Sequence, residues 1–250
     1  MGGSSVVNRT ATLGMGIAHK VTLVFTAMVA TWLGGMSTGR CESGIGIEGG
    51  LFFDSGTRSD EVRLGPTSNT SRDDVGNVDL GFIALFYMHQ LGKDAAAREG
   101  FRIGGEVRYL GRYASEFDDE EVEVVGSLLE VGARGDWSTL ITNELSFVVG
   151  LRVALALAFP EGELADEIDR LAAEGVSAGS GPRVGVTILP SIGARYAIHT
   201  RVNVALNVGL GWSHLSIFAL DETVSGVGYA RDESISNTRF ELGLGLEVSL

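Results

Sequence analysis

The sequence contains little cysteine, proline or lysine, and each shortage excludes a class of protein. A single cysteine, Cys41, can form neither an internal disulfide nor a cysteine-based metal site. The chain has 36 glycines but only 4 prolines, whereas low-complexity chains are typically rich in both residues. Lysine occurs only at positions 20 and 93, and the formal net charge is −13. We therefore expect no nucleic-acid partner, because phosphate binding needs a basic surface.

The chain also lacks a long apolar run beyond its first segment. After residue 39, no stretch stays apolar for the roughly 18 residues that suggest a transmembrane helix. The apolar run at 21–36 follows several basic residues and precedes small ones, as in a secretory signal. We expect residues 1–39 to be a signal peptide, with a retained anchor as the alternative, and residues 40–250 to form one domain.

Alternation of apolar and polar residues is the strongest pattern that is present. In the last stretch, 240–250, every even position is apolar and every odd position is Glu, Gly or Ser. A period of two indicates a strand with one apolar face, and about 9–11 residues is the length of a tilted transmembrane strand. The same pattern along the chain predicts eight strands, at 44–53, 77–91, 100–113, 122–135, 140–159, 182–198, 201–218 and 235–250.

The connections between these strands predict how they are joined. Polar segments at 54–76, 114–121 and 219–234 fall on one side of the strand set, and the connections on the other side are short. This asymmetry and an even strand number predict an all-β, closed, antiparallel up-and-down transmembrane barrel. Between 161 and 175 the apolar period becomes helical, so we expect a short helix in the third extracellular loop. Capping of the barrel mouth is its expected role, and contact with a partner is the alternative.

Alternation alone does not decide which face meets lipid, and a soluble barrel is the alternative. The signal, the loop asymmetry and a polar face that mixes small residues with Arg and Glu favour a membrane barrel. An eight-stranded interior is just wide enough for side chains, so charged groups inside it must pair, and the planar arginine fork suits carboxylates. The expected lumen network is Glu48, Arg102, Glu106, Arg108, Glu130, Arg134, Glu144, Arg152, Arg195, Glu241 and Glu247.

Aromatic residues near the predicted strand ends are expected to form an interfacial girdle. They are Phe53, Tyr109, Tyr113, Trp137, Phe159, Tyr196 and Trp212. In the strand at 77–91, we expect Phe82, Phe86 and Met88 to face lipid, with Tyr87 and His89 on the opposite face.

This architecture resembles the small outer-membrane β-barrel family typified by the OmpA membrane domain and its eight-stranded relatives. The resemblance covers about 44–250 and rests on architecture, not on a signature motif. The terminal strand is similar to the family's assembly signal, here Glu241, Gly243, Leu246, Val248 and Leu250, although the family usually ends in an aromatic residue. The resemblance implies a monomer in the outer membrane of a Gram-negative bacterium. Lipid or lipopolysaccharide and the barrel assembly machinery would be its partners, with an extracellular ligand at the loops as a further possibility.

Three functions remain open at this point. The expected one is a structural or surface-interaction role, in adhesion or envelope integrity, with a largely plugged lumen; a narrow pore for small solutes is one alternative. The other is a lipid A deacylase, because His214 and Ser216 have the H-x-S spacing of that family, with Glu222 or Glu233 to orient the histidine. A rim histidine explains the same residues, so we do not expect an enzyme. No cofactor or metal is expected, because the acidic segments lack calcium-loop spacing.

Overall fold

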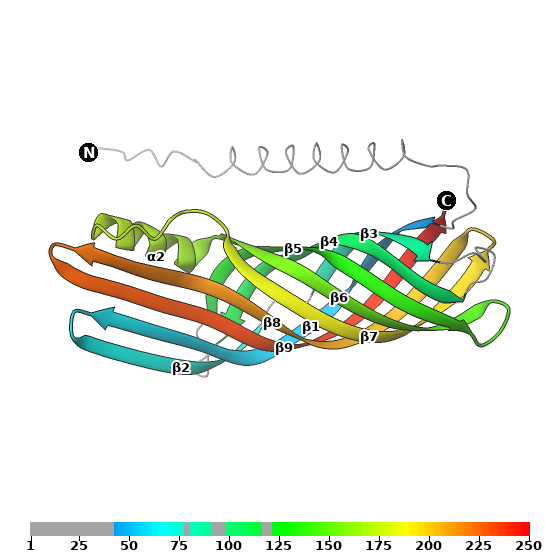
Figure 1. Ribbon diagram of the computed structural model, residues 1–250, viewed down its shortest axis with the longest axis horizontal. Helices are drawn as coiled ribbons and strands as arrows, with labels where there is room; N and C mark the ends of the chain where they lie inside the picture. Colours follow the sequence, from blue (N-terminus) through cyan, green and yellow to red (C-terminus); the bar gives the residue numbers. More distant parts are fainter. Residues whose placement is uncertain (1–42, 78–80, 92–98, 117–121) are drawn as a thin grey trace, which may run out of the picture. The chain divides into compact units, whose positions relative to one another are not determined.

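The computed structural model describes residues 43–77, 81–91, 99–116 and 122–250 (Figure 1). The predicted signal peptide at 1–39, Cys41 and most of the acidic connection at 114–121 lie outside the described residues. Among the residues that are described, no helix is long and apolar enough to cross a bilayer.

The described chain folds into one antiparallel sheet and one helix. In chain order the elements are β1 (Ser43–Leu64), β2 (Thr67–Asn77), β3 (Gly81–Leu91), β4 (Gly100–Glu116), β5 (Val122–Leu140), β6 (Leu145–Pro160), α2 (Gly162–Ala173), β7 (Arg183–His199), β8 (Val202–Val224) and β9 (Val227–Ser249). The sheet order is β2-β1-β3-β4-β5-β6-β7-β8-β9, and β9 pairs back onto β1. Eight strands therefore form a closed ring with β2 outside it, which confirms the predicted eight-stranded up-and-down barrel.

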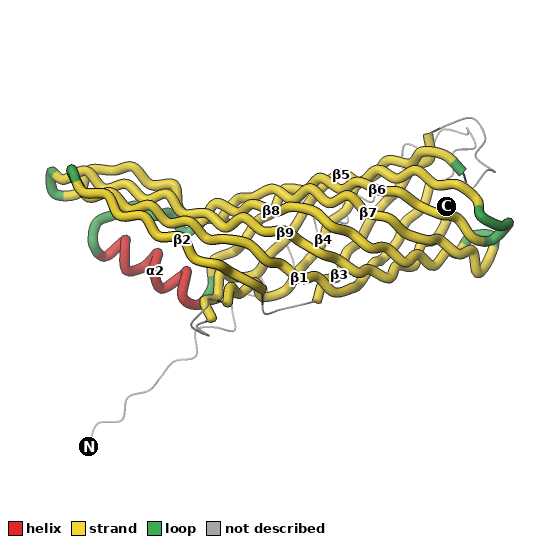
Figure 2. The backbone as a smooth tube through the Cα atoms, turned by 90° about the horizontal axis from the view of Figure 1, so that it is seen from below, coloured by secondary structure: helices red, strands yellow, loops and turns green. Residues whose placement is uncertain are grey.

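The two ends of the barrel differ. The first described residue, Ser43, accepts a backbone hydrogen bond from Leu250 at 2.7 Å, so the start of β1 and the end of the chain meet at one end (Figure 1). We call this the terminal end; it also carries the connections at 141–144 and 200–201. The opposite end, called the loop end, carries α2 and two long hairpins (Figure 2).

The polar segments predicted as loops at 54–76 and 219–234 are mostly strand, so that prediction is wrong. β1 pairs with β2 as far as Leu64–Thr67, and β8 pairs with β9 as far as Val224–Val227. β1 and β9 also stay paired along this whole stretch. These segments contain many Ser and Thr residues, and their backbone pairing continues where the apolar period stops. Each hairpin is closed by a tight turn with a glycine of positive φ, Gly65 in one and Gly226 in the other. Together, β2-β1-β9-β8 form a four-stranded extension, which we call the projecting sheet.

The outer surface of the ring is apolar and exposed, the reverse of a soluble barrel. On β1, Ile45, Ile47, Leu51 and Phe53 are 41–46% exposed, while Glu48 on the inner face is 4% exposed. Aromatic residues of the predicted girdle face outward near both ends of this apolar band: Phe53, Tyr109, Trp137, Tyr196 and Trp212. A closed ring pairs its strands without free edges, and its exterior suits hydrocarbon, so the fold is a transmembrane barrel.

The expected faces of β3 are reversed. Phe82, Phe86 and Met88 are buried in the lumen, and Tyr87 lies on the outer face. The reason lies on β1, where glycine leaves the room that these rings occupy. A Cβ on Gly46 would lie 2.2 Å from the Phe86 ring.

Two further details of the predicted strands are wrong, the end of β5 and the regularity of β4. β5 continues past its predicted end at residue 135 to Leu140, so the turn lies at 141–144. In β4, the register shifts after Tyr109, and Gly111 adopts φ +74°, which marks a bulge. The bulge turns Tyr113 inward, where it is 4% exposed, instead of outward into the girdle.

An apolar core fills the loop end of the barrel. The helix α2 buries Leu164, Ile168 and Leu171, the three residues whose spacing predicted it. They join inward-facing residues of the ring and the projecting sheet, among them Phe52, Phe82, Leu110, Val125, Leu128, Phe218 and Ile235. The apolar side of α2 is thus packed into the barrel mouth, as expected of a cap.

Candidate functional site

The lumen contains a lattice of buried arginines and carboxylates. Every strand of the ring except β3 and β8 contributes at least one inward-facing charge to it. We call this set the lumen lattice; its members are Glu48, Asp54, Arg102, Glu106, Arg108, Glu130, Arg134, Asp136, Arg152, Arg195, Arg239, Glu241 and Glu247. Ten of the eleven predicted lumen residues lie in it. The other, Glu144, is exposed in the turn at 141–144.

Sequence reasoning missed three members of the lattice. Asp54 and Arg239 continue the inward period of β1 and β9, and Asp136 continues that of β5. All three are 6% exposed or less. The periodicity was therefore a usable signal, but Asp54 and Asp136 lie beyond the predicted strand ends.

The layer nearest the terminal end is centred on Arg102 of β4. Its guanidinium donates to both oxygens of Asp136, each at 2.9 Å, and to Glu247 at 2.6 Å. This is the two-pronged geometry in which arginine binds a carboxylate most strongly. Arg195 of β7 adds a longer contact to Asp136 at 3.4 Å. The layer thus joins β4, β5, β7 and β9 across the lumen.

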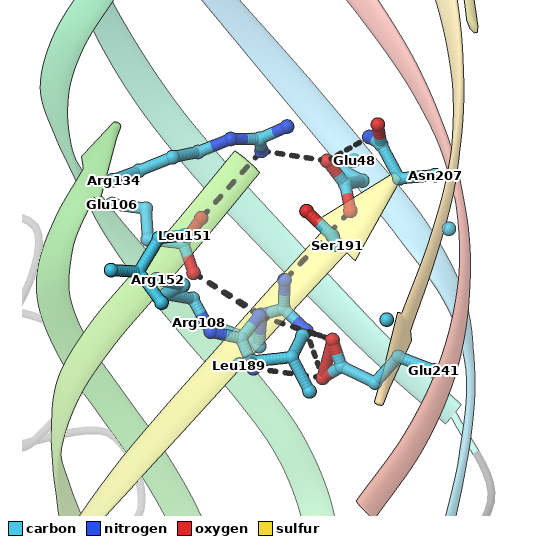
Figure 3. A pocket seen from close by; sticks show the side chains of 12 residues that line it. Glu48, Glu106, Arg108, Arg134, Leu151, Arg152, Leu189, Ser191, Asn207 and Glu241 are labelled. Atoms are coloured by element: carbon cyan, nitrogen blue, oxygen red, sulfur yellow. Dashed lines mark hydrogen bonds and ion pairs between the residues drawn. The ribbon is translucent and has the colours of Figure 1, made fainter. Parts of the chain in front are cut away.

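The middle layer joins opposite walls of the barrel (Figure 3). Glu241 of β9 accepts hydrogen bonds from Arg108 of β4 and from Arg152 of β6, the latter at 2.8 and 3.1 Å. Glu48 of β1 accepts from Arg134 at 2.8 Å. Glu106 lies among these arginines, with Arg152 nearest at 3.3 Å.

The layer nearest the loop end is centred on Arg239, which is 1% exposed. It donates to both oxygens of Asp54 at 2.7 Å and to Glu130 at 2.6 Å. Thr187 donates a further hydrogen bond to Glu130 at 2.8 Å. The inward turn of Tyr113 places its hydroxyl 3.4 Å from Asp54.

Aromatic rings support the arginines of the lattice. Arg108 lies 4.0 Å from the centre of the Phe82 ring, and Arg134 lies 4.9 Å from that of Phe86. A guanidinium over a ring face gains cation–π attraction, and more so where water is excluded. The apolar inner face of β3 is therefore part of the charged site.

The lattice leaves little space in the described part of the lumen. A cavity of about 20 Å³ lies beside Glu106 and Arg108, and one of about 10 Å³ lies beside Thr187. A water molecule needs a cavity of roughly 10–15 Å³, so each of these two cavities has room for about one water molecule. A larger cavity of about 260 Å³ opens at the terminal end, lined by Gln90, Arg195 and Asn203 among others. The described residues thus form a plug above an open vestibule.

A second group of charges holds α2 in place beyond the apolar band. Arg231 of β9 lies 2.7 Å from both Glu167 of α2 and Glu233, and Arg58 of β1 also pairs with Glu233. Hydrogen bonding from Arg170, and then from Arg231, lowers the pKa of Glu167 to about 2. Burial raises the pKa of Glu233, against the effect of the two arginines.

The H-x-S residues are not brought together as a catalytic set. The side chain of His214 stacks on Trp212 and is hydrogen-bonded to Ser236 of β9 at 2.8 Å. Glu222 instead accepts a hydrogen bond from the backbone of Ser177 at 2.9 Å. Among the described residues, no hydrogen bond links His214 to Ser216, although both lie on the same face of β8.

The described residues contain no group of three or more His, Cys, Asp or Glu placed to hold a metal ion. The proposed assembly residues divide between the two faces of β9. Leu246 and Val248 face outward, while a Cβ on Gly243 would meet the Glu48 carboxylate at 2.4 Å. Gly243 thus makes room for a lattice carboxylate.

The fold and its exterior define a class: a small outer-membrane-type β-barrel. No family model matches the chain, and neither does any curated protein. Solved structures similar to it include OprG from Pseudomonas aeruginosa, at 12% identity and TM-score 0.45, covering 82% of this chain and 95% of that one. Neisserial surface protein A is 12% identical, with TM-score 0.33, covering 79% and 96%. These two neighbours are small outer-membrane barrels, and at this level of similarity they carry no argument about what this chain does.

Proposed function

We propose that this protein is a non-conducting barrel of the bacterial outer membrane that stabilises the envelope and presents a rigid surface to the outside. The observation that carries the proposal is the lumen lattice, whose arginines are paired across the barrel. A pore would need a continuous water path, and the two small cavities of the lattice hold about one water each. The loop end, which we place outside the cell, carries the projecting sheet and the packed helix α2.

The energetics of the lattice favour the closed state. Opening a path would separate buried pairs such as Arg152–Glu241, whose side chains are 4% and 5% exposed. Leaving one partner of a buried pair uncompensated costs about 3–5 kcal/mol. The narrow-pore alternative therefore has less support than the plug.

Planar lipid bilayers test the plug directly. We expect the native chain to give no steady current. The double variant Arg108→Ala with Glu241→Ala removes a central pair and should give measurable conductance, which shows that inserted protein is detectable. Steady current from the native chain, at a similar level to that of the variant, would contradict the proposal.

The envelope role is tested in cells. A strain without the protein should become more sensitive to detergent, and the native chain should restore resistance. A chain with the tips of the projecting sheet shortened around Gly65 and Gly226 separates the two parts of the role. If the shortened chain restores detergent resistance, the resistance depends on the barrel. If it does not, the resistance depends on the tips of the projecting sheet. Unchanged resistance in the deletion strain would count against an envelope role.

Assembly is part of the same proposal. We infer that the barrel assembly machinery recognises the terminal strand through Glu241, Gly243, Leu246, Val248 and Leu250. The outward exposure of Leu246 and Val248 supports this, because both are accessible from the lipid side.

A further inference from the structure

The outer face of the barrel changes character abruptly at the top of the apolar band. Phe53 of β1 pairs with Phe240 of β9, and their rings lie 6.2 Å apart. The next three outward rows on these two strands consist only of hydroxyl residues: Ser55 with Thr238, Thr57 with Ser236, and Ser59 with Ser234. We call these six residues the hydroxyl face.

On one side of the hydroxyl face, β2 places Gly76, Asp74 and Arg72 opposite Ser55, Thr57 and Ser59. On the other side, β8 extends the face. On β8, Trp212 pairs with Thr238, His214 with Ser236, and Ser216 with Ser234. Trp212 is 43% exposed and stacks on His214 at 5.7 Å between ring centres. The edge of the hydroxyl face therefore carries an exposed aromatic ring at the level of its first row.

The face carries no charge on β1 or β9, although the chain as a whole has a net charge of −13. The row beyond it is acidic, with Glu61 opposite Asp232. Serine and threonine hydroxyls offer hydrogen-bond donors and acceptors, and the flanking pair Asp74 and Arg72 on β2 carries no net charge. This chemistry suits the hydroxyl groups of sugars and provides no net charge that would select for phosphate or metal ions.

The height of the face decides which lipid it fits. Six residues separate Phe53 from Ser59, which is about 20 Å along a strand and about 15 Å along the membrane normal at a tilt of about 35–45°. The headgroup region of an ordinary bilayer is only about 5–8 Å thick on each side. A phospholipid headgroup therefore covers little more than the first row, whereas a lipid with an oligosaccharide headgroup reaches all three.

We propose that the hydroxyl face, with Trp212 at its edge, binds the saccharide of an outer-leaflet glycolipid whose acyl chains lie on the apolar band below. This inference rests on the proposed outer-membrane location and adds a partner to it. The strands run without a break from the lipid contact into the hydroxyl face, so the headgroup of a lipid seated on the band must lie against these rows. Trp212 supplies an apolar surface with a polar edge at that boundary.

The test measures lipid binding to the purified full-length mature barrel by native mass spectrometry in mild detergent. The probes are lipopolysaccharide with its core oligosaccharide and a truncated form without core sugars. The test variant is Ser55→Ala with Thr238→Val. The matched control is Ser68→Ala with Thr70→Val, which makes the same exchanges further out, on β2. Heat-modifiable gel mobility establishes that each variant is folded.

We expect the test variant to lose about four-fold or more in affinity for the complete glycolipid, since each net hydrogen bond contributes about two-fold or more. Its affinity for the truncated form, and both affinities of the control variant, should change by less than about two-fold. Trp212→Leu should reproduce the loss. Equal binding of both lipids, an unaffected test variant, or a dimer that the test variant abolishes would each overturn the inference. The last outcome would assign the face to a second copy. Bilayer insertion and conductance report separately on the proposed function.

Discussion

Replacement of Arg239 by methionine tests whether the lumen lattice stabilises the barrel. Arg239 is 1% exposed and donates three hydrogen bonds, two to Asp54 and one to Glu130. Methionine retains much of the side-chain volume but leaves both carboxylates without their main partner. Breaking a buried pair in this way costs about 3–5 kcal/mol. At about 2–4 °C per kcal/mol for a chain of this size, the unfolding midpoint should fall by about 6–20 °C.

The assay is the temperature at which the heat-modifiable gel band of the purified barrel shifts to its unfolded position. The matched control is Arg63→Met, because Arg63 is 60% exposed in its pair with Glu61 and an exposed pair contributes little to stability. Adding Asp54→Asn and Glu130→Gln to Arg239→Met should recover part of the lost stability, since no charge is then left unpaired. A midpoint for Arg239→Met within about 2 °C of the native value would refute the reasoning.

Three further results are expected. Gly46→Val should prevent folding or strongly lower the unfolding midpoint, because a Cβ at this position would lie 2.2 Å from the Phe86 ring. Gly81→Val is the control, because Gly81 faces open space, and it should leave the midpoint nearly unchanged. Similar midpoints for the two variants would contradict this packing. The pKa of Glu167 is lowered to about 2, so its contribution to docking of α2 is present above about pH 4.5 and is lost only as pH falls toward 2. Hydrogen exchange of the helix at pH 8 should therefore be faster in Glu167→Gln than in the native chain, and equal rates in the two would be inconsistent with this. Finally, Ser216→Ala should leave lipid A acylation unchanged by mass spectrometry, and altered acylation would revive the hydrolase alternative.

The strand period predicted most of the site because it determines which residues share a face. Arg152 and Glu241 could be assigned to the lumen without knowing their partners, since every second residue of a barrel strand points inward. The same rule applied to Asp136, but a Gly-Asp pair resembles a turn, and the predicted strand ended before it. In the projecting sheet the outer face is polar and the inner face mixes apolar residues such as Phe218 with charges such as Arg231, so the apolar period disappears although the strands stay paired.

The other wrong predictions have local causes, which the alternation of apolar and polar residues along a strand does not reveal. Both faces of β3 are rich in large side chains, so its own residues do not indicate which face is inside. The decision depends on glycines of the neighbouring strand, such as Gly46, which admit a ring. Tyr113 follows a bulge at Gly111, and an extra residue reverses every later assignment on that strand. Partners across the lumen, such as Arg102 and Glu247, are 145 positions apart and follow only from closure of the ring.

The unbroken length of β1, β8 and β9 has a mechanical consequence. These strands contain 22 or 23 residues, or about 75 Å of extended chain, of which only about ten residues are needed to cross the bilayer. At the far tip, the backbone of Gly65 donates to Gly228 at 2.8 Å, which fastens the two hairpins to each other. A pull on this tip loads many backbone hydrogen bonds in shear along the strands. The projecting sheet and the ring are thus one continuous sheet, so a force applied at the tip passes through these backbone hydrogen bonds into the transmembrane strands.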